Sequence, residues 1–316
     1  MSNILLISIF TFFSLIILRL YIFIWNIYFK DKIPTGAGII LLFIYSYTFI
    51  YNFNLFEQIS LYYYIFFVLS CVYFLDDVYS LDYKIRIFLI LLISVFLLLL
   101  LSSINSNVEF NLLNLVIVIL IFFLAVNYLN FQDGADLNLL VISFSIVLIF
   151  IFFNYPFYSN NSIFFNLLIG FFISFSFFNY KPKNLYLGDT GALLLATLIC
   201  LYISYSILEN HKENLLFLSP LLFIFIDCSY VLMVRIYKKE NLLSRNFLHL
   251  YQKYEIKFKN KFYLIPYLIN YIFIVFITQL FFVDIITIYQ ALVIIISITL
   301  ISYFTFSFYL IKKNEL

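Results

Sequence analysis

Long apolar runs separated by short polar segments dominate this sequence. Eleven runs are long enough, or nearly so, to cross a bilayer as helices, at 4–28, 39–56, 59–75, 87–104, 112–129, 139–155, 163–180, 190–208, 215–236, 263–283 and 285–310. A bilayer core needs roughly 20 apolar residues in a helix. Only 11% of the residues are charged, against about a quarter in soluble domains. The sequence predicts an all-α integral membrane protein of about 11 transmembrane helices, forming one polytopic domain over residues 1–316 with no separate soluble domain.

The basic residues predict how these helices are oriented. If the N-terminus lies outside, sixteen of the eighteen Lys and Arg residues fall in cytoplasmic connections, and short basic loops resist translocation. Lys212 would lie outside, and Arg19 lies within the first run. We therefore expect the N-terminus outside and the C-terminus in the cytoplasm. Five cytoplasmic loops then carry most of the polar chemistry, at 30–38, 76–86, 127–138, 181–191 and 236–262.

The third of these loops contains the stretch NYLNFQDGAD, at 127–136. Asn127, Asn130, Asp133 and Asp136 recur every three residues, so a helical or 3₁₀ backbone would place all four on one face. Carboxylates and amides beside hydrocarbon cost free energy unless water, a partner or a metal satisfies them. Oxygen ligands of this kind suit a hard cation such as Mg²⁺. A polar turn rich in Asn and Asp is the alternative interpretation.

Two adjacent carboxylates, Asp76 and Asp77, follow the third run. Adjacent carboxylates repel one another, so we expect a cation, a metal or a shared proton beside them. In a helix they would point about 100° apart and could not do the same job. Asp76 is a candidate general base, and Lys84 and Arg86 are candidates for holding an anion. Asp82 lies four residues before Arg86, a spacing that predicts an ion pair on a helix.

Two later loops add further candidates. Asp189 lies between Gly188 and Gly191 at the expected start of a helix. It would either cap that helix or lie in a ligand site, because the two glycines let the backbone come close to a ligand. Arg245 and His249 lie in the last loop and are candidates for a functional site. The alternative interpretation is that this loop is a basic segment at the lipid headgroups.

Asp227 is the carboxylate that lies inside an apolar run. Ionisable residues within membrane segments are commonly functional, and we expect Asp227 to pair with Arg235 eight residues on. The three cysteines, Cys71, Cys200 and Cys228, all fall in apolar runs without metal-ligand spacing. They are interpreted as small core residues.

Taken in order, the five loops resemble those of the polyprenyl-phosphate N-acetylhexosamine-1-phosphate transferase superfamily (glycosyltransferase family 4). The resemblance covers nearly the whole chain and rests on PTGAG (34–38), DDVYSLDYKIR (76–86), NYLNFQDGAD (127–136), YLGDTGA (186–192) and RNFLHLYQK (245–253). Each motif alone is weak, whereas the ordered set is specific. The superfamily includes phospho-MurNAc-pentapeptide transferase and the enzymes that start O-antigen, teichoic acid and N-glycan assembly.

The resemblance implies a transfer of N-acetylhexosamine-1-phosphate from a UDP-sugar to polyprenyl phosphate, with release of UMP. It implies Mg²⁺ as cofactor, with Mn²⁺ as a substitute. The implied catalytic residues are Asp76, Asp77, Asp189 and His249, and the implied metal site is Asp189 with Asn130. The implied substrate-binding residues are Lys84, Asn127, Asp133, Asp136 and Arg245. Among them Asp136 would lie towards the uracil, and Arg245 and His249 would close over the diphosphate.

The chain departs from the superfamily pattern at three places. Thr35 to Gly38 stand where many relatives have an Arg and a run of Gly, which weakens the case for a phosphate site in that loop. Leu137 replaces the usual Gly after the second Asp of the third motif. HLYQ, at 249–252, replaces a His-rich stretch of the peptidoglycan enzymes. This favours the branch that initiates O-antigen or capsule over phospho-MurNAc-pentapeptide transferase, which stays the alternative.

The expected partners follow from the same resemblance. They are UDP-N-acetylhexosamine, polyprenyl phosphate (undecaprenyl phosphate) and the lipid bilayer, with a homodimer left open and no nucleic acid. The expected location is the bacterial inner membrane, with the site facing the cytoplasm. A polytopic ion-coupled transporter is the competing class, and it predicts ionisable residues near the bilayer midplane and internal repeats. The acidic residues instead cluster at one rim, apart from Asp227, and no motif repeats between the halves.

Overall fold

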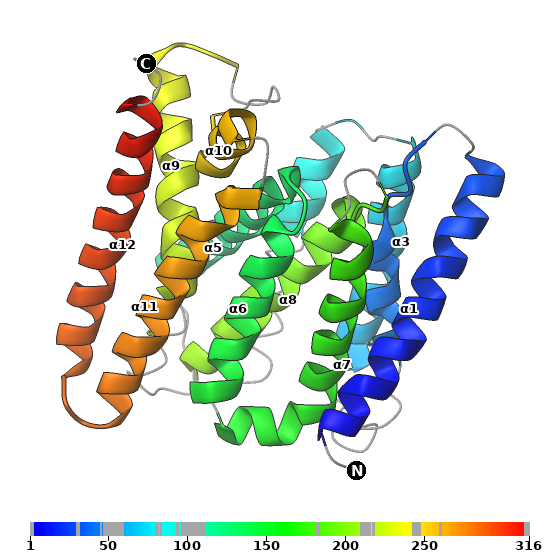
Figure 1. Cartoon of the computed structure of the whole chain (residues 1–316), viewed down its shortest axis with the longest axis horizontal. Helices are drawn as coiled ribbons and strands as arrows, with labels where there is room; N and C mark the ends of the chain where they lie inside the picture. Colours follow the sequence, from blue (N-terminus) through cyan, green and yellow to red (C-terminus); the bar gives the residue numbers. More distant parts are fainter. Residues whose placement is uncertain are drawn as a thin grey trace. The chain divides into compact units, whose positions relative to one another are not determined.

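The computed structural model shows the protein as an assembly of helices (Figure 1). It describes residues 3–29, 32–44, 46, 60–79, 82, 84–92, 95, 112–153, 155–180, 184–208, 216, 219–241, 248–258 and 261–312. Within those ranges all regular structure is α-helix or 3₁₀ helix, which confirms the predicted all-α class.

The α-helices lie close to the predicted apolar runs. They are α1 (Asn3–Tyr28), α3 (Ser60–Tyr79), α5 (Leu112–Phe131), α6 (Asn138–Phe153), α7 (Tyr155–Asn179), α8 (Gly188–Leu208), α9 (Leu222–Tyr237), α10 (Leu250–Phe258), α11 (Ile265–Phe282) and α12 (Ile288–Lys312). The 3₁₀ helices are η1 (Ala37–Ile40), η3 (Gln132–Gly134) and η5 (Lys261–Leu264). Long apolar segments form these helices because a helix satisfies its own backbone hydrogen bonds in lipid.

Four helices of the described part are long and apolar enough to cross a membrane, at Ile4–Tyr28, Ser219–Tyr237, Phe262–Phe282 and Ile288–Leu310. Large apolar side chains lie exposed along them, such as Phe23 on α1 and Ile301 on α12, as expected of helices bordered by lipid. The predicted runs 39–56 and 87–104 lie largely outside the described residues. The total of about eleven spans and their orientation therefore stay predictions.

The chain divides into two compact units. The first comprises Met1–Leu140 and Phe150–Cys200, and the second comprises Val141–Ile149 and Leu201–Leu316. In the first unit α1 packs along α7 (Figure 1). A Cβ on Gly170 of α7 would lie 3.2 Å from the Thr11 backbone nitrogen of α1. Glycine here therefore lets the two helices approach closely.

In the second unit α11 and α12 form an antiparallel pair, and α12 also packs on α9 (Figure 1). Aromatic rings join the three helices. The Phe223 ring lies 4.9 Å from that of Tyr267 and 5.8 Å from that of Tyr303, in both cases edge to face. Helix α10 was not expected, because its sequence LYQKYEIKF lies in the loop predicted at 236–262.

Candidate active site

Two glycine-containing loops of the first unit meet backbone to backbone. The Tyr186 N–H donates to the Pro34 carbonyl at 2.8 Å, and the Gly38 N–H donates to the Leu187 carbonyl at 3.1 Å. A Cβ on Gly38 would lie 2.0 Å from the Gly191 Cα. The glycines are needed here because two backbones touch. The sequence left open whether a ligand lies close to Gly188 and Gly191. In this structure the close neighbour of Gly191 is the backbone of Gly38.

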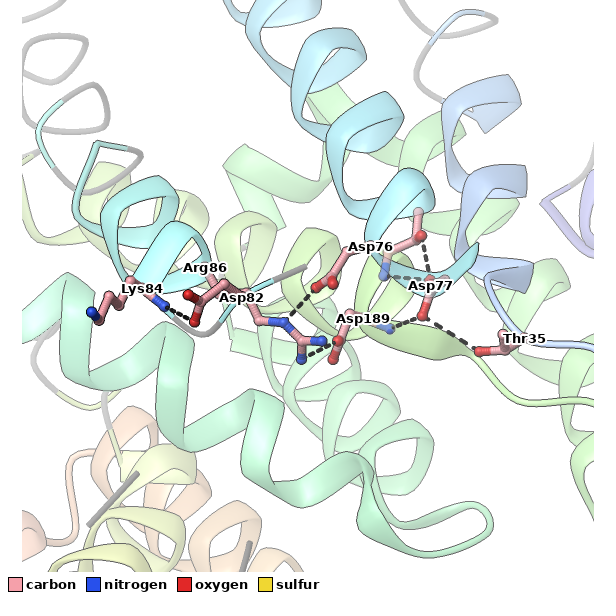
Figure 2. Close-up of polar contacts among 8 residues, drawn as sticks. Thr35, Asp76, Asp77, Asp82, Lys84, Arg86 and Asp189 are labelled. Atoms are coloured by element: carbon pink, nitrogen blue, oxygen red, sulfur yellow. Dashed lines mark hydrogen bonds and ion pairs between the residues drawn. The ribbon is translucent and has the colours of Figure 1, made fainter. Parts of the chain in front are cut away.

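Asp77 caps helix α8 from a different helix, α3 (Figure 2). Its Oδ1 accepts the Asp189 N–H at 2.8 Å, and its Oδ2 accepts the Thr190 N–H at 3.0 Å and the Thr190 hydroxyl at 2.6 Å. The Thr35 hydroxyl donates to Oδ1 at 3.4 Å. Gly188, with φ 75°, comes so near that a Cβ would lie 2.5 Å from Oδ2. A carboxylate here satisfies helix N–H groups and faces the positive end of the helix dipole.

The interpretation of Asp189 as the cap of its own helix is therefore wrong. Helix α8 begins at Gly188, so Asp189 belongs to the first turn and its N–H is one of the capped groups. The Asp189 side chain is free of that task. The pKa of Asp77 is raised to about 6, chiefly by burial and to a smaller extent by the Asp189 charge, although the hydrogen bonds from Thr190 and the Asp189 backbone act in the opposite direction.

Arg86 joins two carboxylates that are 113 positions apart in the chain, Asp76 and Asp189 (Figure 2). Its Nε lies 2.8 Å from Asp76 Oδ2, and its Nη1 lies 2.8 Å from Asp189 Oδ2. The Asp76 side chain is 1% exposed, whereas that of Asp189 is 27% exposed. The guanidinium fork suits such a double contact because its donors are fixed in one plane.

The predicted ion pair between Asp82 and Arg86 is wrong. The Asp82 carboxylate accepts the Lys84 N–H at 3.3 Å, and the Asp82 carbonyl accepts the Ile85 and Arg86 N–H groups at 2.9 and 3.2 Å. Asp82 thus begins the helix that follows it, which leaves the Arg86 side chain for the two more distant carboxylates. Lys84 is exposed on that helix.

The stretch 127–136 continues α5 and then breaks. Asn127 and Asn130 lie in α5, and Asp133 lies in η3. The backbone turns extended at Ala135, with φ −141° and ψ 150°. The helical path therefore ends before Asp136, and the expectation of a single face for all four polar residues does not hold for that one. The Asn127 amide donates to the Phe123 carbonyl of its own helix at 2.7 Å.

Asp133 feels the charges of α3 and α8. Burial raises its pKa well above the usual range, and the charges of Asp189, Asp77 and Asp136 add to that effect. The loop after α5 thus brings further carboxyl groups to the site that holds Asp77 and Asp189. The residues of this acidic site are Asp76, Asp77, Asp133, Asp136 and Asp189.

Three polar residues outside the predicted set hold the loop in place. Leu137 adopts the left-handed conformation, with φ 63°, and its N–H donates to Asn179 Oδ1 at 2.6 Å. The Asn138 amide donates to the Gln132 carbonyl at 3.0 Å and to Gln132 Oε1 at 3.1 Å. Asn138 and Asn179 each lie next to the end of an apolar run, and Gln132 lies three residues beyond one. Their hydrogen-bond partners lie in turns, which the spacing of apolar residues in the sequence does not predict.

The donors of the acidic site fit a hard divalent cation. They are all carboxylate oxygens, which Mg²⁺ prefers, and Arg86 forms ion pairs with two of these carboxylates, Asp76 and Asp189. Burial is the main cause of the raised pKa values of Asp77 and Asp133, because it disfavours their charged forms, whereas a bound cation would favour those forms. The predicted pairing of Asp189 with Asn130 around a metal stays a prediction.

In the second unit His249 is held by the buried Asp227. His249 Nδ1 lies 2.9 Å from Asp227 Oδ2. Asp227 Oδ1 accepts the Leu250 N–H at 3.0 Å and the Tyr303 hydroxyl at 3.3 Å. The expected pair of Asp227 with Arg235 is wrong, because Arg235 Nε lies 3.5 Å from Glu240.

These contacts explain why α10 exists in a basic, weakly apolar segment. The Leu250 N–H is satisfied by Asp227, and Gln252 Oε1 accepts the His249 N–H at 3.2 Å. The second contact is the reciprocal half of a capping box. Among the described residues, three metal-ligand atoms come within 4.8 Å of one another at Asp227, Cys228 and His249. The predicted partner Arg245 lies outside the described residues.

The described part of the chain thus combines helices long and apolar enough to cross a membrane with an acidic site in its loops. The model of glycosyl transferase family 4 matches residues 59–207. That region runs from α3 to α8 and contains all five carboxylates of the acidic site. The match supports the predicted glycosyl transferase family 4 superfamily and a transferase activity. No curated protein matches the chain.

Proposed function

We propose that this protein transfers N-acetylhexosamine-1-phosphate from a UDP-sugar to a polyprenyl phosphate and releases UMP. The observation that carries the proposal is the coincidence of the family match with the acidic site. Asp76 and Asp189 meet at Arg86 there, and the charges of Asp77 and Asp189 act on Asp133. A site of clustered carboxylates suits the handling of a diphosphate through a divalent cation.

Asp189, with Asn130, would hold Mg²⁺ (or Mn²⁺) in this proposal. When bound, the ion neutralises charge on the donor diphosphate. Asp77 fixes the first turn of α8 and so positions Asp189. Asp76 is the proposed base next to the acceptor, and the exposed Lys84 attracts its phosphate. An oxygen of the lipid phosphate attacks the sugar-bearing phosphorus, and the bond to the UMP oxygen breaks.

The proposed location is a bacterial inner membrane, with the N-terminus outside and the site facing the cytoplasm. The support is the bias of basic residues. Single cysteines at Ser80 and Gln252, in a variant without the native cysteines, should react with an impermeant reagent only from the cytoplasmic side. A cysteine at Asn107 should react only from outside. Labelling of Ser80 and Asn107 positions from the same side would contradict this topology.

The reaction is tested by identifying the nucleotide product. Attack at phosphorus releases UMP, whereas attack at the sugar carbon would release UDP. Since one phosphoric anhydride replaces another, the equilibrium should lie near even, and labelled UMP should exchange into UDP-sugar in the presence of the lipid product and Mg²⁺. Release of UDP without UMP exchange would exclude the proposed reaction. Cation flux without nucleotide turnover would favour the transporter class.

The proposed pathway is the initiation of an O-antigen or capsule glycan, and its support is the HLYQ sequence at 249–252. Mass spectrometry of the lipid products formed from a panel of UDP-sugars would identify the donor. Turnover of UDP-MurNAc-pentapeptide in preference to UDP-N-acetylhexosamines would instead favour the peptidoglycan enzyme.

A further inference from the structure

Arg86 places a positive charge between two carboxylates of the acidic site, Asp76 and Asp189. Its guanidinium neutralises two carboxylates at once, through Nε at 2.8 Å from Asp76 and Nη1 at 2.8 Å from Asp189. Asp189 is the residue most directly implicated in holding the divalent ion of the proposed function. One oxygen of Asp189, Oδ2, is therefore already engaged by a side chain of the protein itself.

The two ends of this bridge differ in exposure. The Asp76 side chain is 1% exposed, so breaking its contact with Arg86 would separate a buried carboxylate from a cation, which is costly. The Asp189 and Arg86 side chains are 27% and 35% exposed, so water can replace the contact between them. The contact of Arg86 with Asp189 is therefore the easier of the two to exchange for another partner.

We propose that Arg86 is a resident counter-cation, whose contact with Asp189 is exchanged for a divalent ion when the donor diphosphate binds. The inference rests on the proposed function for the identity of that diphosphate. A guanidinium and a divalent ion repel each other when both lie beside one carboxylate. A phosphate group relieves the conflict, because it accepts hydrogen bonds from the released Nη1. The metal should therefore bind weakly alone and more tightly together with the diphosphate.

The experiment measures binding of Mn²⁺ alone, by electron paramagnetic resonance of the free ion, to the full chain in lipid nanodiscs without nucleotide or lipid acceptor. Arg86→Gln should raise the Mn²⁺ affinity by about tenfold or more, because a positive charge near the ion is removed. Arg86→Lys keeps the charge and should stay within about threefold of wild type. Lys84→Gln is the matched control: it removes a charge two residues away, from an exposed side chain, and should change the affinity by less than about twofold.

An unchanged or weaker Mn²⁺ affinity in Arg86→Gln would overturn the proposal, and so would an equal gain in Lys84→Gln. If Arg86→Gln does not yield folded protein, the comparison moves to Asp76→Asn. The double variant Asp76→Asn/Arg86→Gln leaves no unpaired charge at position 76 and should bind Mn²⁺ more tightly than Asp76→Asn alone. A lack of any gain there would equally refute the idea. The assay requires no turnover, so its outcome is independent of whether UMP is the product.

Discussion

The acidic site of the first unit differs from the Asp227 cluster of the second unit, which consists of Asp227, His249, Leu250 and Tyr303. The difference lies in how the carboxylates are satisfied. Asp227 is fully buried and alone, and three groups from α10, its N-cap and α12 bind its two oxygens. The acidic site gathers five carboxylates, and the described ion pairs to them come from Arg86. A carboxylate whose oxygens are satisfied within the fold serves to position other groups. Carboxylates that lie near one another need a cation or a shared proton beside them.

Asp77 combines features of both kinds of carboxylate. It lies in the acidic site by position, yet the contacts of both of its oxygens are those of a helix cap. Adjacent residues thus have different partners, since Asp76 faces Arg86. The comparison predicts that the five acidic-site residues will not behave alike when they are replaced.

The largest effect is expected at Asp189. Asp189→Asn should reduce UMP release by about a hundredfold to a thousandfold, as for loss of one group that stabilises developing charge. Folding should be retained, because the helix cap uses the Asp189 backbone N–H and not its side chain. Turnover is checked with size-exclusion profile and melting temperature on the same preparation. Asp82→Asn, which removes an exposed carboxylate from the same region, is the control and should be mild. Near-normal Mg²⁺-dependent turnover in Asp189→Asn would place the metal elsewhere.

A change at Asp227 should act mainly on stability. Asp227→Ala should lower the free energy of unfolding by about 3 kcal/mol, because it leaves the buried His249 and Tyr303 without their shared partner. Asp227→Asn keeps two hydrogen-bonding atoms and should cost less. Reversible denaturant unfolding in detergent measures the difference. A loss below about 1 kcal/mol for Asp227→Ala would mean that the cluster is not a positioning device.

Asp77→Ala should destabilise the first turn of α8. The expected loss is about 1–2 kcal/mol, the range found for removal of an N-cap, and hydrogen exchange of the Thr190 amide should quicken. Thr190→Val, which removes only the 2.6 Å hydroxyl contact, should show a smaller loss in the same direction. Unaltered exchange at the start of α8 would exclude the capping role and move Asp77 back among the purely catalytic candidates.

The smallest effect is expected at Leu137. A left-handed backbone costs a residue with a Cβ about 1–2 kcal/mol, and glycine loses about 0.5–1 kcal/mol in chain entropy. Leu137→Gly should therefore stabilise the protein by roughly 0.5 kcal/mol, seen as a small rise in melting temperature. Leu137→Ala, which keeps the Cβ, is the control and should give no such rise. A clear loss of stability in the glycine variant would show that Leu137 packing outweighs its backbone strain.

Hydrophobicity predicted most of the described fold, because lipid-facing helices need apolar side chains over their whole length. Helix α1 is expected at 4–28 and observed at Asn3–Tyr28. Helix α10 was missed for the opposite reason. Its sequence is basic and only weakly apolar, and its first N–H is satisfied by Asp227, which precedes it by 23 residues. Such a helix depends on tertiary contacts that the local pattern does not contain.

The site shows the same limit. The separation of Asp76 from Asp77 follows from helix geometry alone, and their partners in the structure do differ. The partner of each carboxylate could not be predicted from the sequence. Arg86 forms ion pairs with Asp76 and Asp189, which lie farther away in the chain, and not with Asp82 four residues away. Leu137 was noted as a departure from the family pattern, yet only its φ of 63° explains why that pattern has glycine there.

The contact between Gly38 and Gly191 also has a mechanical meaning. Side chains in a packed interface can switch rotamers and so absorb small movements of one element against another. Two backbones that touch have no such slack, and the hydrogen bonds of Gly38 with Leu187 and of Tyr186 with Pro34 fasten them on either side. The segment after α1 and the first turn of α8 must therefore move as one piece. Any displacement of residues 34–38 would therefore be passed to the backbone of the first turn of α8, which carries Asp189.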